Sequence, residues 1–326
     1  MRALVYRRYG PPDVVVLEEV PKPVPARNEV LIRIHATTIT SADWRARSLK
    51  TPPGFGPVGR LVFGIVKPRY PILGTELAGE ISAIGAGVTR FEPGDRVIAF
   101  SALTYGCHAE FKTMPENGLI APKPANLSYE QAAALSFGGT TALDFLRDKG
   151  GLAPGEKVLI VGASGGVGSA AVQLARHFGA DVTGVCSSAN VDLVKSIGAH
   201  RVIDYTQTDF ARGTASYDII LDTTGTTSYA RCERVLNDGG RLLLVLATLA
   251  QSLGFGRAPA SSGKKVITGT AAERLEDLQI LVDLAEAGHF TPVIDKVYTP
   301  EQAVAAHAHV DSGRKRGNVI IRFAAA

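Results

Sequence analysis

The first third of the chain has one kind of pattern of apolar and polar residues. Short apolar runs with the spacing of strands are separated by clusters of turn-forming residues, such as the Gly-Pro-Pro-Asp cluster at 10–13. The runs lie at 3–6, 14–18, 29–36, 76–84 and 96–100. This pattern predicts a twisted β-rich domain with irregular loops over residues 1–126.

From residue 127 onward, helical and strand-like patterns alternate. Ser128 is placed to cap a helix, with Gln131 at the capping-box position. Short apolar strands are predicted at 158–161, 182–186, 201–205, 217–223, 241–246 and 265–270. Their alternation with helices is typical of an α/β fold with a doubly wound sheet of about six parallel strands, which places a Rossmann domain at 127–270.

The end of the chain predicts a return to the first domain. A helical pattern at 273–287 and a strand at 318–323 lie within residues 271–326, which we assign to the β-rich domain. The connection at 247–263 is rich in glycine, serine and proline, so a mobile loop near the cofactor is predicted there. We expect the active site in the cleft between the two domains.

Residues 157–188 carry the strongest functional signal. The apolar run 158–161 is typical of a strand buried on both faces, and it breaks at the glycine-rich turn 162–168 before a helix with one apolar stripe. Strand, glycine turn, helix and strand form the βαβ unit that binds a dinucleotide pyrophosphate at the helix N-terminus. The residues predicted to hold the phosphates are Ser164, Gly165, Gly166 and Val167.

Composition and charge exclude several other classes of protein. The 326 residues carry 35 basic and 31 acidic side chains, a net charge of +4 that is too diffuse to favour nucleic acid. The three cysteines are far apart, with no disulfide framework and no CxxC pair. No apolar run has the length of a membrane span, and the first residues lack the apolar core of a signal peptide. We expect a cytoplasmic protein with no membrane partner.

Several short motifs occur in a fixed order along the chain. One group is Gly74-Thr75-Glu76-Leu77-Ala78-Gly79, Val88 and Gly94-Asp95-Arg96-Val97; the other is Gly155-Glu156, Leu159, Ala163-Ser164-Gly165-Gly166, Gly168, Gln173 and Arg176. With them the chain resembles the medium-chain dehydrogenase/reductase superfamily, in its zinc-independent quinone oxidoreductase (zeta-crystallin-like) branch. The resemblance covers nearly the whole length. It implies a partly open, GroES-like β-barrel catalytic domain with a Rossmann domain inserted, and a homodimer paired through 265–270.

The resemblance also bears on metal binding. Zinc-dependent relatives hold a catalytic zinc with Cys, His and Cys or Asp, and the aligned positions here are Thr40, Thr75 and Phe137. Threonine and phenylalanine supply neither thiolate nor imidazole, and the four-cysteine structural zinc lobe is missing as well. We therefore predict no metal.

The second strand of the βαβ unit indicates the type of nicotinamide. NAD-preferring sites place an acid about 20 residues past the glycines, whereas this strand ends in Ser187 and Ser188 with no acid at its tip. Small hydroxyl groups can donate to a 2′-phosphate. Tyr205 matches a family position against that phosphate, although Ala189 and Asn190 replace the usual basic residue. NADPH is the predicted cofactor.

The resemblance implies further site residues. Thr40 and Asp43 are the catalytic candidates, the latter at a family position near the nicotinamide; the alternative is an Asp that caps a helix. The remaining cofactor candidates are Thr140, Thr224, Gly317 and Asn318. The basic side chains at 314–316 are expected to face solvent.

Without a metal, the simplest reaction is hydride transfer to an acceptor that is already electron-poor. The predicted function is a zinc-free, NADPH-dependent reductase of a quinone or an α,β-unsaturated carbonyl, hence of a small molecule. Two alternatives stay open: an enoyl-thioester reductase, and a non-catalytic NADPH-binding protein.

Overall fold

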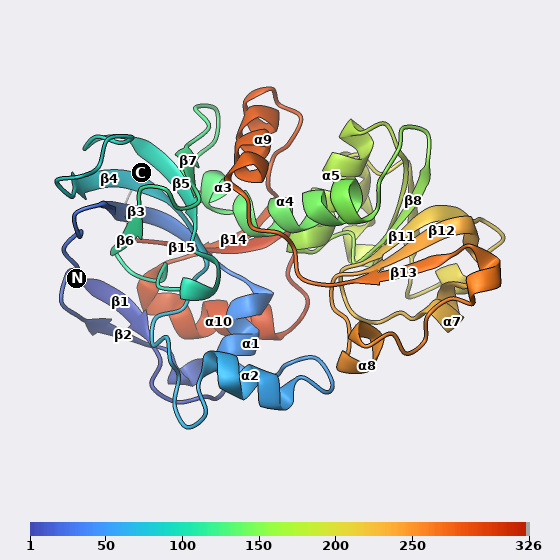
Figure 1. The fold of residues 1–326 in the computed structure, drawn as a ribbon, viewed down its shortest axis with the longest axis horizontal. Helices are drawn as coiled ribbons and strands as arrows, with labels where there is room; N and C mark the ends of the chain where they lie inside the picture. The colour runs from blue at the N-terminus through green and yellow to red at the C-terminus, as the bar shows by residue number, and fades with distance from the viewer. Residues whose placement is uncertain (324–326) are drawn as a thin grey trace. The chain divides into compact units, whose positions relative to one another are not determined.

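The structure is a computed structural model that describes residues 1–323. The chain divides into two compact units (Figure 1). Unit 1 comprises Met1–Thr51, Gly56–Phe137 and Glu273–Ala326, and unit 2 comprises Pro52–Phe55 and Gly138–Ala272. In sequence, unit 2 is thus inserted into unit 1.

Unit 1 is built on a seven-stranded, mainly antiparallel sheet of order β14-β15-β3-β4-β5-β7, with β6 also paired to β3. These strands are β3 (Glu29–Ile39), β4 (Glu76–Ile84), β5 (Arg96–Phe100), β6 (Phe111–Pro115), β7 (Ile120–Pro122), β14 (Ile294–Tyr298) and β15 (Asn318–Arg322). A separate hairpin pairs β1 (Arg2–Val5) with β2 (Val16–Glu19). β3 pairs with three strands, and its alternating Val30, Ile32 and Ile34 are buried in the core of this unit.

Unit 1 also contains α-helices. They are α1 (Ser41–Ser48), α2 (Gly56–Phe63), α3 (Tyr129–Ala133), α9 (Leu275–Glu286) and α10 (Ala303–Asp311). The fully buried Arg47 of α1 pairs with Asp311 of α10 at 2.5 Å, so burial of the guanidinium is compensated by an opposite charge. The predicted strand at 14–18 begins only at Val16, because the prolines before it form a short 3-10 turn at Pro12–Val14.

The boundary between the units lies later than residue 127. The His35 ring on β3 stacks on the Tyr129 ring of α3 at 4.1 Å, and Arg322 of β15 pairs with Glu130 at 2.5 Å. These contacts make α3 part of unit 1, and the division falls between Phe137 and Gly138. The predicted capping box of Ser128 and Gln131 is confirmed.

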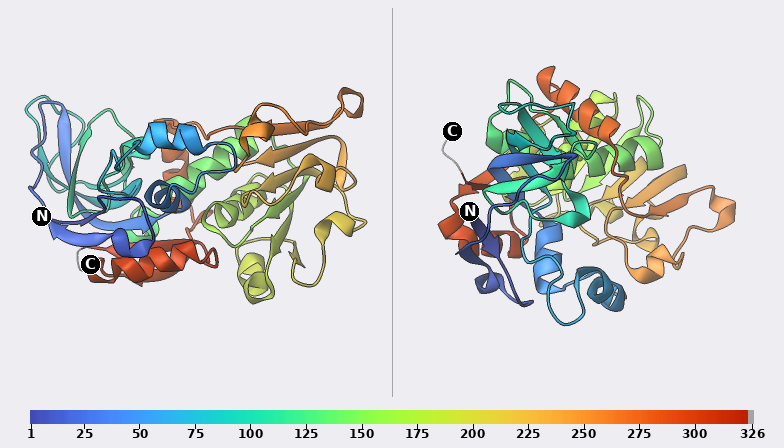
Figure 2. Two further views of the ribbon diagram at one scale, coloured as in Figure 1. Left: turned by 90° about the horizontal axis from the view of Figure 1, so that it is seen from below. Right: turned by 60° about the vertical axis from the view of Figure 1, so that its left-hand side comes forward.

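Unit 2 contains the predicted doubly wound sheet. Its six strands are all parallel in the order β10-β9-β8-β11-β12-β13, and they run side by side in Figure 2. They are β8 (Lys157–Val161), β9 (Asp181–Cys186), β10 (Arg201–Asp204), β11 (Tyr217–Asp222), β12 (Leu236–Leu244) and β13 (Lys265–Thr268). The strand order reverses at β8, and in such sheets ligands bind beyond the carboxyl ends of the strands at this point. The predicted α/β fold class is confirmed.

The helices of unit 2 connect these strands. They are α4 (Ser136–Leu143), which continues as a π-helical turn at Asp144–Lys149, α5 (Gly166–His177), α6 (Val191–Ser196), α7 (Tyr229–Cys232) and α8 (Leu249–Ser252). The connection at 247–263, predicted to be a loop, contains α8, which begins at a Thr248–Gln251 capping box. None of the helices in the described part of the chain has the length and apolar character needed to cross a bilayer.

Candidate active site

The turn between β8 and α5 is a tightly packed glycine loop. Gly162 adopts φ +81°, and a Cβ there would lie 2.4 Å from Cγ2 of Thr224. A Cβ on Gly168 would lie 2.0 Å from the carbonyl oxygen of Gly162, so only glycine allows this approach of helix to loop. Gly165 is the N-cap of α5 and offers no side-chain cap, which leaves the first N–H groups of the helix available to an anion. The loop therefore fits a pyrophosphate.

Two other cofactor candidates lie around this loop. A Cβ on Gly138 of α4 would lie 2.7 Å from the Gly166 carbonyl oxygen, so α4, which carries the buried Thr140, approaches the N-terminus of α5. Thr224 lies in a turn folded around the buried Asp222, whose carboxylate accepts from the Thr224 hydroxyl at 2.7 Å and from the Thr227 N–H at 2.8 Å. The structure thus brings Thr224 and the start of α4, two residues before Thr140, to the glycine loop within unit 2.

Asn190 links the two predicted serine positions, a role that the sequence analysis missed. Its Nδ2 donates to the Ser164 hydroxyl at 3.0 Å and to the Ser187 hydroxyl at 3.3 Å. Its Oδ1 is buried and has no partner in the described residues. The amide therefore couples the phosphate loop to the tip of β9 and leaves one acceptor atom for a ligand. Asn190 immediately precedes α6, so its place at the N-terminus of a helix was a usable signal.

An acid on the neighbouring strand β10 lies beside the end of β9. Asp204 pairs in register with Cys186, and its carboxylate accepts from the Ser188 hydroxyl at 2.6 Å and from the Thr206 hydroxyl at 2.7 Å. These hydrogen bonds lower the pKa of Asp204. β9 itself ends without an acid, as predicted, and Asp204 lies beside its end because the parallel neighbour β10 ends at the same edge of the sheet. Tyr205 follows Asp204 and is 61% exposed.

In unit 1, Thr40 and Asp43 form the capping box of α1. The Thr40 hydroxyl donates to Asp43 Oδ2 at 2.7 Å and accepts from the Asp43 N–H at 3.3 Å. Asp43 Oδ1 accepts from the Gly74 N–H at 2.8 Å, and the Asp43 side chain is fully buried. These contacts give both side chains a role in positioning the chain segments at 40–43 and 74.

Two of the three positions at which zinc-dependent relatives have metal ligands, Thr75 and Phe137, lie at Glu76, whereas Thr40 hydrogen-bonds to Asp43. The buried carboxylate of Glu76 accepts from the Thr38 hydroxyl and from the Phe137 N–H, both at 2.6 Å. The hydroxyl of the adjacent Thr75 is buried and has no partner in the described residues. Burial raises the pKa of Glu76 to about 7, against the lowering effect of its hydrogen bonds. Across residues 1–323, no group of three His, Cys, Asp or Glu side chains could hold a metal ion.

Lys315 points inward, which corrects the expectation that the basic side chains at 314–316 face solvent. Its ammonium group donates to the Gly317 carbonyl oxygen at 2.5 Å, and burial lowers its pKa to about 8 against the opposing effect of Asp295 and Glu76. Position 317 requires glycine. Its φ is +64°, and a Cβ there would lie 2.2 Å from the Val293 carbonyl oxygen. The Asn318 amide donates to the same oxygen at 3.1 Å. In unit 1 both residues thus shape the start of β15.

Cys107 behaves as a packing residue. It is fully buried, and burial raises the pKa of its thiol to about 11, so the thiol is protonated at neutral pH. His307 is also buried, with neither ring nitrogen hydrogen-bonded, whereas His309 lies 3.1 Å from Asp295. The two histidines point in different directions, as their spacing on the helix predicts.

Comparison with known proteins agrees with this architecture. Residues 26–125 match the family model of the alcohol dehydrogenase GroES-like domain, and residues 197–321 match that of the zinc-binding dehydrogenases. The chain is 31% identical to a chloroplast envelope quinone oxidoreductase homolog of Arabidopsis thaliana, over 98% of both chains. It is 32% identical to 2-methylene-furan-3-one reductase of Solanum lycopersicum, over 98% of this chain and 79% of that protein.

The fold is likewise similar to that of solved structures. The quinone oxidoreductase of Coxiella burnetii superposes with a TM-score of 0.88 over 99% of both chains, at 26% identity. Together with the sequence relatives, this places the chain among oxidoreductases that use a nicotinamide cofactor. The protein therefore belongs to the medium-chain dehydrogenase/reductase superfamily, in its quinone oxidoreductase branch.

Proposed function

We propose that the protein is a zinc-free, NADPH-dependent reductase that transfers hydride to a quinone or an α,β-unsaturated carbonyl. The observation that carries this proposal is the chemistry of Thr40, Thr75 and Phe137, the residues aligned with zinc ligands. Threonine and phenylalanine occupy the three positions at which zinc-dependent relatives have ligands, and the Thr75 hydroxyl is left without a partner. A site of this composition favours an acceptor that needs no Lewis acid.

The glycine loop and the residues around it support the cofactor assignment. When bound, NADPH supplies the hydride. Gly165, Gly166 and Val167 would hold its pyrophosphate with backbone N–H groups, and the Ser164 hydroxyl would donate to the same phosphates. Ser187, Ser188 and Tyr205 would hold the 2′-phosphate, and Thr140 and Thr224 would lie along the nicotinamide ribose.

In unit 1 we assign binding and positioning to the chain's own groups. The Thr75 hydroxyl is the donor assigned to the acceptor's carbonyl oxygen, where negative charge develops. Thr40 and Asp43 are assigned the role of positioning residues, because their hydrogen bonds hold the segment before Thr75 in place through the Gly74 N–H. The proton that the reduced acceptor needs would come from water.

The proposal is tested by NADPH oxidation with 1,4-benzoquinone, a simple enone and crotonyl-CoA, each with and without a chelator. We expect turnover of the quinone or the enone that the chelator does not change. In Thr75→Val we expect a kcat about a hundredfold lower or more, since loss of one donor to a developing oxyanion costs about 10²–10³ in kcat. Loss of activity with the chelator would refute the zinc-free assignment. No turnover of any acceptor would favour a protein that only binds the cofactor.

A further inference from the structure

The segment 56–69 of unit 1 presents apolar side chains to the surface. Val58 and Leu61 on α2 are 47% and 65% exposed, and Ile65 and Val66 in the turn after it are 65% and 90% exposed. Single exposed apolar residues are common on globular proteins. Several within one short segment are typical of a surface that contacts a protein, a membrane or a ligand. We call these four residues the apolar tip.

The apolar tip is held in shape by polar contacts. The Arg60 guanidinium donates to the Ile65 carbonyl oxygen at 3.0 Å, and the Arg69 guanidinium donates to that of Leu61 at the same distance. The Tyr9 hydroxyl donates to the Gly64 carbonyl oxygen at 2.7 Å, which ties the turn to the N-terminal part of unit 1. The four apolar side chains are therefore exposed by a defined structure.

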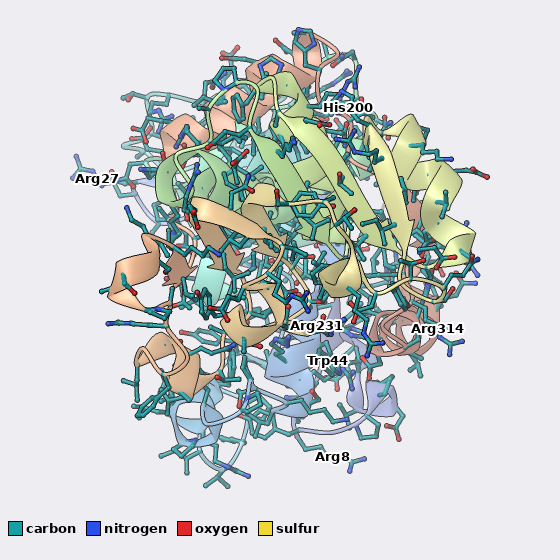
Figure 3. The ribbon with its side chains drawn as sticks, turned by 90° about the vertical axis from the view of Figure 1, so that its right-hand side faces the viewer. Arg8, Arg27, Trp44, His200, Arg231 and Arg314 are labelled. Atoms are coloured by element: carbon teal, nitrogen blue, oxygen red, sulfur yellow. The ribbon has the colours of Figure 1, made fainter. Side chains whose placement is uncertain are left out.

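The chain segment that carries the apolar tip has charge of one sign. No Asp or Glu occurs in residues 44–75, whereas the exposed Lys50, Arg60, Lys67 and Arg69 do. Arg8, one residue before Tyr9, is also exposed and extends away from the ribbon in Figure 3. Of the neighbouring basic residues, Arg47 is neutralised by Asp311 and Arg7 by Glu18. The segment thus combines apolar side chains with unbalanced positive charge.

We propose that segment 56–69 binds the surface of a membrane that contains anionic lipid, in contrast to the expectation from composition that the protein has no membrane partner. The apolar tip would enter the interface between headgroups and acyl chains, and the basic side chains would contact the headgroups. This is an interfacial contact of a helix and a turn, and it needs no spanning helix. A second copy of the chain fits less well, because a symmetric contact would set this positive patch against itself.

The test is co-sedimentation of the full chain with vesicles of phosphatidylcholine, alone or with about one third phosphatidylserine, at low and high salt. We expect binding to the anionic vesicles that weakens as salt rises, and little binding to phosphatidylcholine alone. The double variant Leu61→Gln/Val66→Gln should bind the anionic vesicles about tenfold less than the wild type. The single variant Lys67→Gln should bind them about threefold less.

Matched controls are Val304→Gln, an exposed apolar residue on α10, and Arg27→Gln, a basic residue that extends from another edge in Figure 3. Both should bind as the wild type does. The proposal would be overturned if the wild type did not bind the anionic vesicles, or if the double variant bound them as well as the wild type does. A wild-type mass that rises with concentration and falls in the double variant would also overturn it, in favour of contact between copies. Urea unfolding reports the folding of each variant and depends on neither lipid binding nor the proposed reductase activity.

Discussion

The Asp204 carboxylate and the Ser188 hydroxyl illustrate how one contact bears on the choice of cofactor. Ser188 is proposed to donate to a 2′-phosphate, yet its hydroxyl already donates to Asp204 at 2.6 Å. A carboxylate that is hydrogen-bonded to Ser188 opposes a phosphate at that hydroxyl and suits a free ribose hydroxyl. Asp204 therefore works against the NADPH preference that Ser187, Ser188 and Tyr205 favour, and the preference is expected to be weak.

Replacement of Asp204 by Asn tests this balance. Loss of the negative charge beside the proposed 2′-phosphate site removes a repulsion, so kcat/KM for NADPH relative to NADH should rise about fivefold. Steady-state kinetics with both cofactors measures the ratio. Asp192→Asn on α6, an exposed position, is the matched control and should leave the ratio unchanged. An unchanged ratio in Asp204→Asn would mean that the carboxylate does not face the cofactor.

At the scale of elements, the glycine loop joins β8 to α5 through backbone contacts that no side chain can replace. A Cβ on Gly168 meets the backbone of Gly162 and Ala163 within 3 Å, whereas a Cβ on Gly165 meets only the Gly162 carbonyl oxygen at 3.4 Å. The first is a requirement of folding and the second leaves the fold intact. Substitution at Gly168 therefore tests the packing of the helix, and substitution at Gly165 tests the approach of the phosphate.

We expect Gly168→Ala to lower the free energy of unfolding by about 1–3 kcal/mol, as overpacking in a dense site does, and to weaken NADPH binding as well. Gly165→Ala should leave the free energy of unfolding within about 0.5 kcal/mol of wild type and still weaken NADPH binding, because its methyl group lies on the phosphate side. Urea unfolding and NADPH fluorescence titration measure the two quantities. Equal NADPH affinity in Gly165→Ala would contradict the placement of the pyrophosphate.

At the scale of the whole molecule, two buried groups act on stability in opposite directions. The folded-state pKa of Glu76 is raised from 4.5 to about 7, so ionisation of this carboxyl is disfavoured in the folded state and stability falls as pH rises through that window. Burial holds the pKa of His307 well below 6.5, so this group must remain neutral and stability falls as pH drops below 6.5. Between about pH 4.5 and 6.5 the two effects oppose each other.

Replacing one of these two side chains should leave the effect of the other on the pH dependence of stability visible. Glu76→Gln keeps partners for Phe137 and Thr38, because the amide oxygen can accept and the Thr38 hydroxyl can itself accept. Its free energy of unfolding, relative to wild type, should rise with pH by up to about 1.4 kcal/mol per unit between pH 5 and 7. His307→Leu should show the reverse, a relative gain as pH falls from 6.5 to 5.

Urea unfolding at pH 5, 6 and 7 measures these differences. The exposed Glu19→Gln is the control, because it removes a carboxylate that lies at the surface. Parallel pH profiles for wild type and Glu76→Gln would show that the carboxyl does not titrate in this range.

Much of this protein is determined by local sequence. The apolar run at 158–161, the glycine turn after it and the stripe of the next helix predict their elements, because burial on both faces, positive φ and helical spacing leave direct marks on residue choice. The Ser128 capping box and the six-strand parallel sheet follow in the same way and are confirmed. The positions Thr40, Thr75 and Phe137 are likewise readable from motif order.

Tertiary structure alone decided what surrounds those residues. Asp204 reaches Ser188 because β10 ends beside β9, and Lys315 turns toward Glu76 although charged neighbours flank it in sequence. The Gly74 N–H, from a segment distant in the sequence, reaches the buried carboxylate of Asp43 in the local Thr40–Asp43 capping box. Such outcomes depend on pairing between segments far apart in the chain, and local residue patterns do not encode which distant charge or hydroxyl a side chain will meet.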